Sequence, residues 1–380
     1  MEFQFDEQQE LFRATVREFV QAEVAPNAAR WEDDERFPWD TWRQMADLGL
    51  CGVSLPEKYG GGGGGKTLLC IATEELARAS GGLSVAYLVS GGVAMDGICM
   101  HGSEAQKRTY VGRCAGGEVA FFALTEPAGG SDVAPMRMRY RQATDGYVLN
   151  GTKLFISNGE ESSFGVVFAT QDPGLGHKGV SAFVVDKDSP GLSVGRRERK
   201  TGQHCSSTTE LVFEECPVPR DALIGDEGQG LSIALEAIDK SRVTVAAQAL
   251  GIARAAYDES VSYAKERQAF GKVLGQLQAI QFMLADSVTE LEIARLLTYR
   301  AAWLIDRGNL GIKESAMAKL YSSEAAGRIC HRAVQIFGGI GYTREAAVER
   351  YARDQRVTEI YEGTSEMQRW AIARQVLGVK

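Results

Sequence analysis

The feature that most constrains the fold of this chain is a change in the spacing of its apolar residues along the sequence. Up to about Gly117, apolar residues recur at helical intervals, and Pro26 ends the first predicted helix. From residue 118 to 228 the spacing shortens towards two, and β-branched and aromatic runs alternate with turn residues. Helical spacing returns from Leu231 onward. The pattern predicts an N-terminal α-helical domain, a middle β-domain of antiparallel strands and a C-terminal α-helical bundle, at 1–117, 118–228 and 229–380.

Individual elements are predicted within these regions. The expected strands are short and lie at 147–149, 164–169, 180–185 and 211–213. The expected helices each carry an apolar stripe opposite a charged face, and they lie at 68–79, 245–268, 276–307 and 312–337.

The composition is that of a globular protein and argues against several classes of function. Of 380 residues, 44% are hydrophobic and 24% are charged. The formal charge of −8, without a dense Lys/Arg block, argues against a general nucleic-acid-binding protein. Seven cysteines without a C-x-x-C pair indicate reduced thiols, and four widely spaced histidines argue against a His/Cys metal site.

The N-terminal segment and the lengths of the apolar runs indicate in which compartment the protein is expected. The segment from Met1 to Glu7 lacks the basic start and the apolar run of a signal peptide. No uninterrupted apolar run approaches the roughly eighteen residues that span a bilayer. We therefore expect a cytoplasmic protein without a membrane span.

A run of six glycines, Gly60 to Gly65, precedes Lys66-Thr67 and matches the G-x-x-x-x-G-K-T pattern of a phosphate-binding loop. Such a loop needs a buried strand before it and a helix after it, so that backbone N–H groups cradle the phosphate. A helix can follow at Leu68, but residues 53–59 are short, polar and interrupted by a proline, and no alternating βα pattern follows. A flexible loop is therefore the prediction, with a nucleotide hydrolase as the distant alternative.

Near the C-terminus, Glu362 lies between Tyr361 and Gly363 at a break between two helical patterns. Glycine there lets the backbone turn freely and lets a ligand approach the main chain. A carboxylate held by such a turn, with apolar neighbours that raise its pKa, is suited to removing a proton. From these residues alone, the alternative is an ordinary turn between helices with a solvated Glu.

The stretch from Phe122 to Asp132 combines a strand end, Pro127, two glycines and several hydroxyl or amide donors. Such a loop is able to present backbone N–H groups to a polar ring edge or to phosphate. The alternative is a helix-capping turn around Ser131.

Two further places suit a flat, phosphate-bearing ligand. Phe155 and Ser157 share one face of a predicted strand, which suits a heteroaromatic cofactor but also ordinary sheet packing. Arg267 and Lys272, between two long helices, suggest a pyrophosphate clamp or, equally, a solvated helix end.

Four motifs occur in order along the chain: Thr125-Glu126-Pro127 with Gly130-Ser131-Asp132, Arg267-Gln268-Ala269-Phe270-Gly271, Gln335 with Gly338-Gly339, and Tyr361-Glu362-Gly363-Thr364. Together with the helix–β–helix organisation, they resemble the acyl-CoA dehydrogenase family across nearly the whole chain. The resemblance implies an α+β multidomain fold with a C-terminal four-helix bundle. It also implies FAD as cofactor and a homotetramer arranged as a dimer of dimers.

The resemblance further implies flavin-dependent α,β-dehydrogenation of an acyl-CoA thioester. Glu362 would abstract the α-proton while hydride leaves the β-carbon for flavin N5. The N–H of Glu362 and a flavin ribityl hydroxyl would stabilise developing charge on the thioester oxygen. Electrons would pass to an electron-transfer flavoprotein, in fatty-acid or other carboxylic-acid degradation. The nearest alternative is an FAD-dependent oxidase or monooxygenase on the same fold.

The same motifs imply the binding residues. Those expected around the flavin ring and ribityl chain are Phe122, Leu124, Thr125, Gly130, Ser131, Phe155, Ile156 and Ser157. Those expected on the rest of FAD, partly from a neighbouring subunit, are Arg267, Gln268, Phe270, Leu277, Gln278, Gln335, Gly338 and Gly339, with Thr364 and Glu366 closing over the cofactor. Those expected on the thioester and coenzyme A are Ser131, Asp239, Arg242, Gly363 and Arg374.

Some positions distinguish this chain within the resemblance. Relatives with the base on another helix carry it immediately before the arginine that corresponds to Arg242; here that residue is Ser241, so Glu362 is the base that the sequence supports. The segment from Lys200 to Ser207 lacks the family's common arginine. No arginine occurs near Ser84, which disfavours a dicarboxylic substrate.

Asp96 lies on a helix, expected at 87–100, that would line the acyl pocket, with Gly91 and Gly92 leaving room. A carboxylate is unusual near an alkyl chain. One hypothesis is that Asp96 contacts a polar or cyclic acyl group or acts as a second acid or base. The alternative is that it faces solvent or a helix cap.

Overall fold

The computed structural model describes residues 4–379, so the first three residues of the N-terminal segment considered above lie outside the described part. The N-terminal region is helical, as predicted. The helical turn Val20–Val24 continues α1 and ends just before Pro26, and α4 begins at Gly65 rather than at residue 68. The helices are α1 (Glu7–Phe19), α2 (Ala28–Asp34), α3 (Trp39–Asp47), α4 (Gly65–Ala79), α5 (Gly81–Leu88), α6 (Ala94–His101), α7 (Glu104–Gln106) and α8 (Gly112–Ala115).

The middle region forms one sheet in the order β6-β7-β3-β2-β4-β5-β8, with β1 beside β4. All four predicted strands fall within it, and most pairs are antiparallel, as expected. The exceptions are β1 along β4 and a single pairing of β2 with β4, which are parallel. The strands are β1 (Ala120–Ala123), β2 (Arg139–Ala143), β3 (Gly146–Ser157), β4 (Phe164–Thr170), β5 (Val180–Asp186), β6 (Leu192–Arg197), β7 (Thr208–Pro219) and β8 (Leu223–Ile224).

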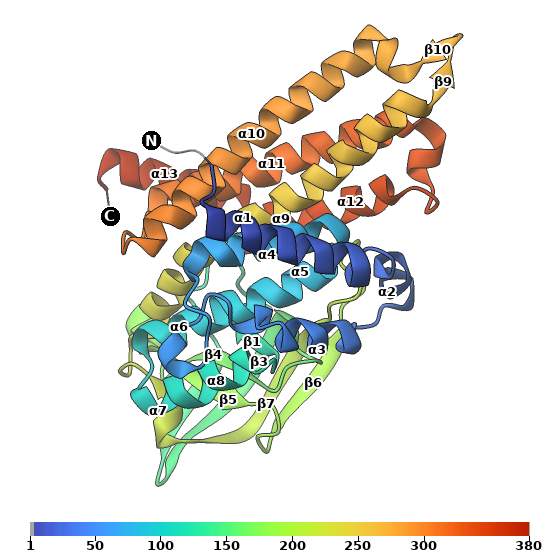
Figure 1. Cartoon of the computed structure of the whole chain (residues 1–380). Helices are drawn as coiled ribbons and strands as arrows, with labels where there is room; N and C mark the ends of the chain where they lie inside the picture. Colours follow the sequence, from blue (N-terminus) through green and yellow to red (C-terminus); the bar gives the residue numbers. More distant parts are fainter. Residues whose placement is uncertain (1–3, 380) are drawn as a thin grey trace.

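The C-terminal region is a bundle of long helices. Helix α9 begins at Gly230, fifteen residues before the start predicted for the long helix, and the prediction began late because the buried polar residues Ser241 and Arg242 interrupt the apolar stripe. Figure 1 shows α9, α10 and α11 side by side, with the β9–β10 hairpin at the end away from the sheet. The elements are α9 (Gly230–Glu266), β9 (Gln268–Ala269), β10 (Lys272–Val273), α10 (Gln278–Asp306), α11 (Ile312–Phe337), α12 (Ala347–Gln355) and α13 (Ser365–Leu377).

The three regions share their core. One apolar cluster contains Ile98 of α6, Phe168 of β4, Val184 of β5 and Ala234 of α9, all of them buried. In Figure 1 the helices α4 and α5 lie between the sheet and the long helices. Side chains at this junction are therefore shielded from water. The predicted domain boundaries fall in the connections between α8 and β1 and between β8 and α9, and they remain a prediction.

The segment that departs from the family pattern, residues 200–207, ties the three regions together. The carboxylate of Glu32 on α2 accepts from the backbone N–H of His204 at 2.9 Å and of Cys205 at 3.3 Å. Asp354 on α12 accepts from the N–H of Gln203 at 2.6 Å. Burial, with the nearby charge of Glu32, raises the pKa of Asp354 to about 7.

One helical stretch, Gly81–His101, is long and apolar enough to cross a membrane by length and composition alone, with a mean hydropathy of 1.5. Its most apolar window is 83% buried within the protein. This burial is what the core helix of a folded domain shows, and it is weak evidence for a membrane span.

The glycine run forms a loop and not a phosphate-binding site. The N–H groups of Gly62, Gly63 and Gly64 donate to the carbonyls of Gly52, Leu55 and Val53 at 2.8 Å, so the loop predicted here is hydrogen-bonded to the segment that precedes it. Short 3₁₀ turns rather than a strand precede it.

The start of α4 is occupied by a side chain of the protein itself. The carboxylate of Asp306 accepts from the N–H of Lys66 at 2.6 Å, the N–H of Thr67 at 3.0 Å and the hydroxyl of Thr67 at 2.5 Å. The anion that a helix N-terminus attracts is therefore an aspartate of α10.

We expect Asp306→Ala to lower the free energy of unfolding by about 2 kcal/mol, because it removes a cap and leaves three donors without an acceptor. Chemical denaturation monitored by circular dichroism measures the change. Asp306→Asn, which keeps one acceptor oxygen, should lose less. An unchanged denaturation midpoint in Asp306→Ala would contradict this role.

Candidate active site

The turn that contains Glu362 has an unusual backbone. It connects the 3₁₀ turn Arg356–Glu359 to α13. Glu362 has φ +49° and Gly363 has φ +92°. The left-handed region costs a non-glycine residue on the order of 1 kcal/mol, so surrounding contacts must hold it. A Cβ at Gly363 would also collide with the side chain of Gln368, so glycine is required there.

Two buried side chains hold this turn. The ammonium of Lys319 on α11 donates to the carbonyl of Gly363 at 2.8 Å. The amide of Gln368 donates to the same carbonyl at 2.8 Å and to the carbonyl of Glu362 at 3.1 Å. Lys319 and Gln368 are fully buried. The strained backbone is thus fixed by donors from two helices.

The phenol of Tyr361 fixes the other side of the turn. It donates to the side-chain oxygen of Gln248 on α9. The amide of Gln248 in turn donates to the carbonyl of Gly81 and to the hydroxyl of Ser84, both at 3.0 Å. The turn is therefore connected to α5 through α9.

The carboxylate of Glu362 is partly buried and bonded within the protein. The hydroxyl of Ser241 on α9 donates to its Oε2 at 2.6 Å. Burial raises the pKa of Glu362 to about 7; the Ser241 hydrogen bond and the charges of Lys319 and Lys66 oppose the rise, and Asp96 adds to it. The alternative of an ordinary turn with a solvated Glu is therefore wrong.

Lys319 is itself affected by this environment. Burial lowers the pKa of its ammonium to about 8, while the neighbouring carboxylate of Glu362 opposes the decrease. Between the two pKa values, the carboxylate and the ammonium are both charged.

The two predicted substrate residues on α9 form an ion pair beside Ser241. Arg242 Nη1 lies 2.5 Å from Asp239 Oδ1. Burial lowers the pKa of Arg242, which nonetheless stays a cation. Among residues 4–379, its Nε is buried without a hydrogen-bond partner. An unsatisfied buried donor of this kind suits an anionic or carbonyl ligand.

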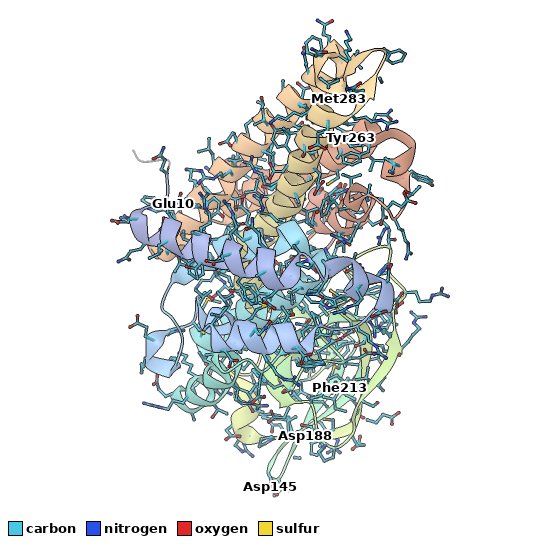
Figure 2. The ribbon with its side chains drawn as sticks, turned by 45° about the vertical axis from the view of Figure 1, so that its right-hand side comes forward. Glu10, Asp145, Asp188, Phe213, Tyr263 and Met283 are labelled. Atoms are coloured by element: carbon cyan, nitrogen blue, oxygen red, sulfur yellow. The ribbon has the colours of Figure 1, made fainter. Side chains whose placement is uncertain are left out.

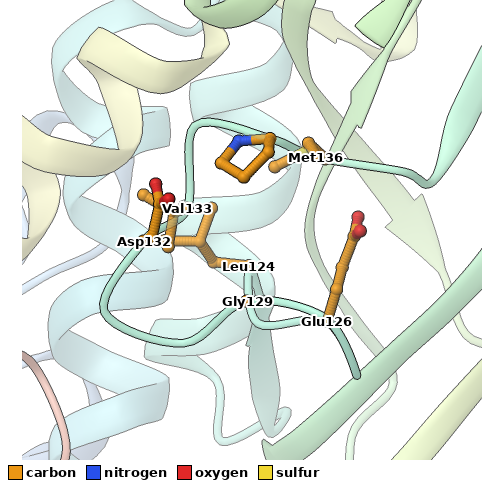
Figure 3. A pocket seen from close by; sticks show the side chains of 7 residues that line it. Leu124, Glu126, Gly129, Asp132, Val133 and Met136 are labelled. Carbon is orange, nitrogen blue, oxygen red and sulfur yellow. The ribbon is translucent and has the colours of Figure 1, made fainter.

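The loop after β1 is closed by Glu126 and borders a pocket. The carboxylate of Glu126 accepts from the N–H of Arg137 at 2.7 Å and of Met138 at 3.0 Å. Lys153 on β3, fully buried, donates to Glu126 at 2.8 Å and to the carbonyl of Leu124 at 3.0 Å. Figure 3 shows the pocket and its lining residues, Leu124, Glu126, Gly129, Asp132, Val133, Pro135 and Met136.

The helix-capping alternative for Ser131 is wrong, because residues 127–138 form no helix. Ser131 and Gly130 are instead exposed on the loop, and Thr125 is half-buried. Phe122, on β1, packs against Phe168 with ring centroids 5.0 Å apart.

Phe155 stands at an irregularity of β3. The register of β3 against β7 shifts between Lys153 and Ile156, and Phe155 has φ +58°. Its side chain is 58% exposed, whereas Ile156 is buried and Ser157 half-buried. The ring therefore does not take part in ordinary sheet packing, and it offers a flat surface to a ligand.

Eight further predicted cofactor residues lie at the far end of the bundle. Figure 1 shows the hairpin there, away from the sheet, and in Figure 2 Tyr263 and Met283 mark this end opposite Asp145. The ring of Tyr263 stacks on Phe337 with centroids 4.1 Å apart, which fixes the end of α11. The predicted residues of this end are Arg267, Gln268, Phe270, Leu277, Gln278, Gln335, Gly338 and Gly339.

A single chain does not bring this end together with the loop after β1. Phe270 is 91% exposed, and within the described part of the chain no atom lies within 4 Å of an added Cβ at Gly338 or Gly339. Arg267 and Lys272 are exposed. These groups are free to contact a ligand held by another copy of the chain.

The predicted residues on α13 are spread along the helix. Thr364 caps α13 by accepting from the N–H of Met367 at 3.4 Å, and Glu366 is exposed in the first turn. Arg374 lies in the last turn, with its guanidinium 4.3 Å from the ring centre of Trp370. Because Arg374 is in the last turn of α13 and Gly363 precedes the first turn, most of the helix separates the two residues.

Sequence reasoning missed several residues of this site. Lys319, Gln368 and Lys153 carried no motif of their own, and Ser241 was considered only as a position that is not a base. The available signal was Lys319, which lies between Ala316 and Ser322 on the alanine-rich face of α11. A cation on a buried face needs a partner, so a lysine at this position indicates a polar contact.

Three domain descriptions of one family match the chain. They are "Acyl-CoA dehydrogenase, N-terminal domain" over residues 6–118, "middle domain" over 121–216 and "C-terminal domain" over 228–377. The chain belongs to the acyl-CoA dehydrogenase family. It is therefore an oxidoreductase that acts on CH–CH bonds, with FAD as its cofactor. The exposed Phe155 ring and the open backbone at Gly338 fit such a cofactor.

Relatives of known name span the whole chain. The mitochondrial short-chain specific acyl-CoA dehydrogenase of Homo sapiens is 45% identical over 372 residues, 98% of this chain and 90% of that protein. The structure of butyryl-CoA dehydrogenase from Megasphaera elsdenii is 37% identical, with a TM-score of 0.97 over 99% of this chain and 100% of that one. A chain from a structural study of the electron transferring flavoprotein of Acidaminococcus fermentans is 40% identical, with a TM-score of 0.98 over 99% and 100%.

We expect Lys153→Met to lower the free energy of unfolding by about 3 kcal/mol, because it leaves Glu126 buried without its cation. The loop after β1 should loosen, and the purified protein should retain less FAD per chain, measured by flavin absorbance. Lys187→Met serves as control, since Lys187 is half-buried in the same region but bonds to Gly159. Equal flavin content in both variants would contradict the role of Lys153.

Proposed function

We propose that this enzyme oxidises an acyl-CoA thioester to the enoyl-CoA with Glu362 as the base. The observation that supports the proposal is the Glu362 carboxylate, partly buried, bonded to Ser241 and with its pKa raised to about 7. A base whose pKa lies near the working pH combines a deprotonated fraction with sufficient basicity.

Each group around the turn has a task in this reaction. The Glu362 carboxylate takes the proton from the α-carbon, and Ser241 orients it. Among residues 4–379, the backbone N–H of Glu362 donates to no acceptor, so it is free to bond the thioester oxygen and stabilise charge there. Bound FAD supplies the acceptor for the hydride that leaves the β-carbon. The buried surroundings exclude water and strengthen these interactions.

The thioester and coenzyme A would contact the polar groups nearest the turn. Arg242, whose Nε lacks a partner, and its companion Asp239 lie on the same helix as Ser241. Gly363, Ser131 and Arg374 complete the proposed set. Arg374 would reach the distant part of the long coenzyme A molecule.

FAD would lie across the loop after β1 and the irregularity at Phe155. The hairpin residues Arg267, Gln268 and Phe270 would reach it from a neighbouring subunit, because they lie at the other end of their own chain. This supports contact between two subunits at the cofactor; we extend it to the homotetramer, a dimer of dimers, that the resemblance implies, with Thr364 and Glu366 closing over the cofactor. We infer an electron-transfer flavoprotein as electron acceptor and a cytoplasmic location.

Glu362→Gln should reduce anaerobic flavin bleaching by acyl-CoA by about a thousandfold, because the amide does not accept the α-proton. Stopped-flow absorbance of the holoenzyme with straight, branched and cyclic acyl-CoAs measures the rate. Glu359→Gln is the matched control, since Glu359 lies three residues earlier and pairs with Arg356 at 3.0 Å. Bleaching unaffected by Glu362→Gln, with rapid reoxidation by oxygen, would instead support a flavin oxidase or monooxygenase.

The bleaching rate at low substrate should rise with pH through about 7, because Glu362 acts only when deprotonated. Ser241→Ala removes a hydrogen bond that favours the carboxylate, so the pKa should rise and the midpoint should move about one unit higher. Ser232→Ala, at an exposed position on the same helix, should leave the midpoint in place. A lower or unchanged midpoint in Ser241→Ala would contradict the assignment.

A further inference from the structure

Two residues that the sequence drew attention to separately are bonded to each other. The ammonium of Lys66, at the end of the glycine run, donates to the Asp96 carboxylate at 2.7 Å. The side chains are 9% and 13% exposed. The alternative that Asp96 faces solvent or a helix cap is therefore wrong, and the lysine of the apparent phosphate-binding motif has a different partner.

The ion pair lies near the Glu362 turn. Asp96 is three residues after Val93 and four before Met100, so the three side chains share one face of the helix. Val93 belongs to a buried apolar cluster, and Met100 and Tyr361 both pack against that cluster. Lys66 and Asp96 are both close enough to Glu362 to affect its pKa.

Gly91 and Gly92 were expected to leave room for an acyl group, but other parts of the protein lie close to them. An added Cβ at Gly91 would come within 3.3 Å of the Cys51 carbonyl oxygen, and one at Gly92 within 3.7 Å of Leu69. Gly91 thus lets the helix approach the backbone at Cys51 closely, whereas at Gly92 an added Cβ would make an ordinary van der Waals contact. The distinctive feature of this helix face is thus the charged pair rather than extra room.

The pair is held in place but has few polar contacts. Asp306 fixes the backbone of Lys66 through its N–H, so the start of the lysine side chain is fixed. Among residues 4–379, Lys66 Nζ and the Asp96 carboxylate bond only to each other. A purely alkyl group beside them would remove both charges from water without offering a hydrogen bond, which is unfavourable.

We propose that the Lys66–Asp96 pair determines acyl specificity by binding a hydroxyl, or another neutral group that both donates and accepts, on the acyl chain beyond its β-carbon. The inference rests on the proposed acyl-CoA dehydrogenation. It adds the substrate class to that function.

The charges of the pair select the kind of polar group. A hydroxyl donates to Asp96 and accepts from Lys66 at once. A carboxylate on the acyl chain would be attracted by Lys66 but repelled by Asp96 and by Glu362, and an ammonium would be attracted by Asp96 but repelled by Lys66, so a charged group satisfies only one partner of the pair. A neutral group with both capacities is the one that satisfies both partners.

The test compares hexanoyl-CoA with hydroxyhexanoyl-CoAs that carry the hydroxyl at each carbon beyond the β-carbon. The second-order rate constant of anaerobic flavin bleaching by each substrate is measured for the wild-type holoenzyme. At least one hydroxylated substrate should be preferred over hexanoyl-CoA by about tenfold or more, as one good hydrogen-bonded site gives.

The variant Lys66→Met with Asp96→Leu removes both charges together, so that no single buried charge remains. Its preference for the hydroxylated substrate should fall at least about tenfold. Asp96→Asn keeps the shape of the side chain and should also lower the preference. This variant tests the proposal if the double variant does not fold. Lys58→Met with Glu104→Leu removes an exposed ion pair of the same region and should leave the preference as in the wild type.

The outcomes separate the two proposals. Equal rates for hydroxylated and plain substrates in the wild type, or a preference that persists in the variants, would overturn the role of the pair while leaving the dehydrogenation intact. A flavin that neither kind of substrate bleaches would overturn the proposed function itself, and this inference with it.

Discussion

The close packing around α9 is the constraint on which the rest of the structure depends. A Cβ added at Gly251 would collide with the carbonyl oxygen of Glu74 on α4, and the helix is continuously buried from Ser241 to Ala253. Helices α10 and α11 also pack against it. Because the helices approach so closely, the polar side chains between them lose contact with water and must bond to one another. The site is built from these forced contacts.

The charges at the site accordingly occur with opposite partners: Lys66 with Asp96, Arg242 with Asp239, and Lys319 beside Glu362. An isolated buried charge costs several kcal/mol, and a nearby opposite charge offsets part of that cost. The balance explains how a carboxylate is kept inside the protein and still titrates near neutral pH. Burial raises the pKa of Glu362, while Ser241 and the two lysines limit the rise to about 7.

Much of the fold was predictable because helices and strands depend largely on neighbouring residues. The bounds of α11 matched their prediction, and the expected strands fell within β3, β4, β5 and β7. Helical spacing was expected from Leu231 onward, but the continuous helix α9 from Gly230 was missed, because polar residues such as Ser241 and Arg242, which the packed helices bury, interrupt the apolar pattern. The parallel pairing of β1 with β4 was missed because strand order depends on contacts between distant segments.

The sequence by itself determined the family, through four motifs in order along the chain, and it placed Glu362 at a turn, because Gly363 at a break between helices lets the backbone turn freely. Only the tertiary structure decided what surrounds that carboxylate. Ser241 lies 121 residues away, Lys319 is 44 residues from Gly363, and Lys66 is 30 from Asp96. Such pairs form only when packed helices bring the two residues together. Neither the periodicity of apolar residues nor a short motif predicts which side chains of different helices are in contact.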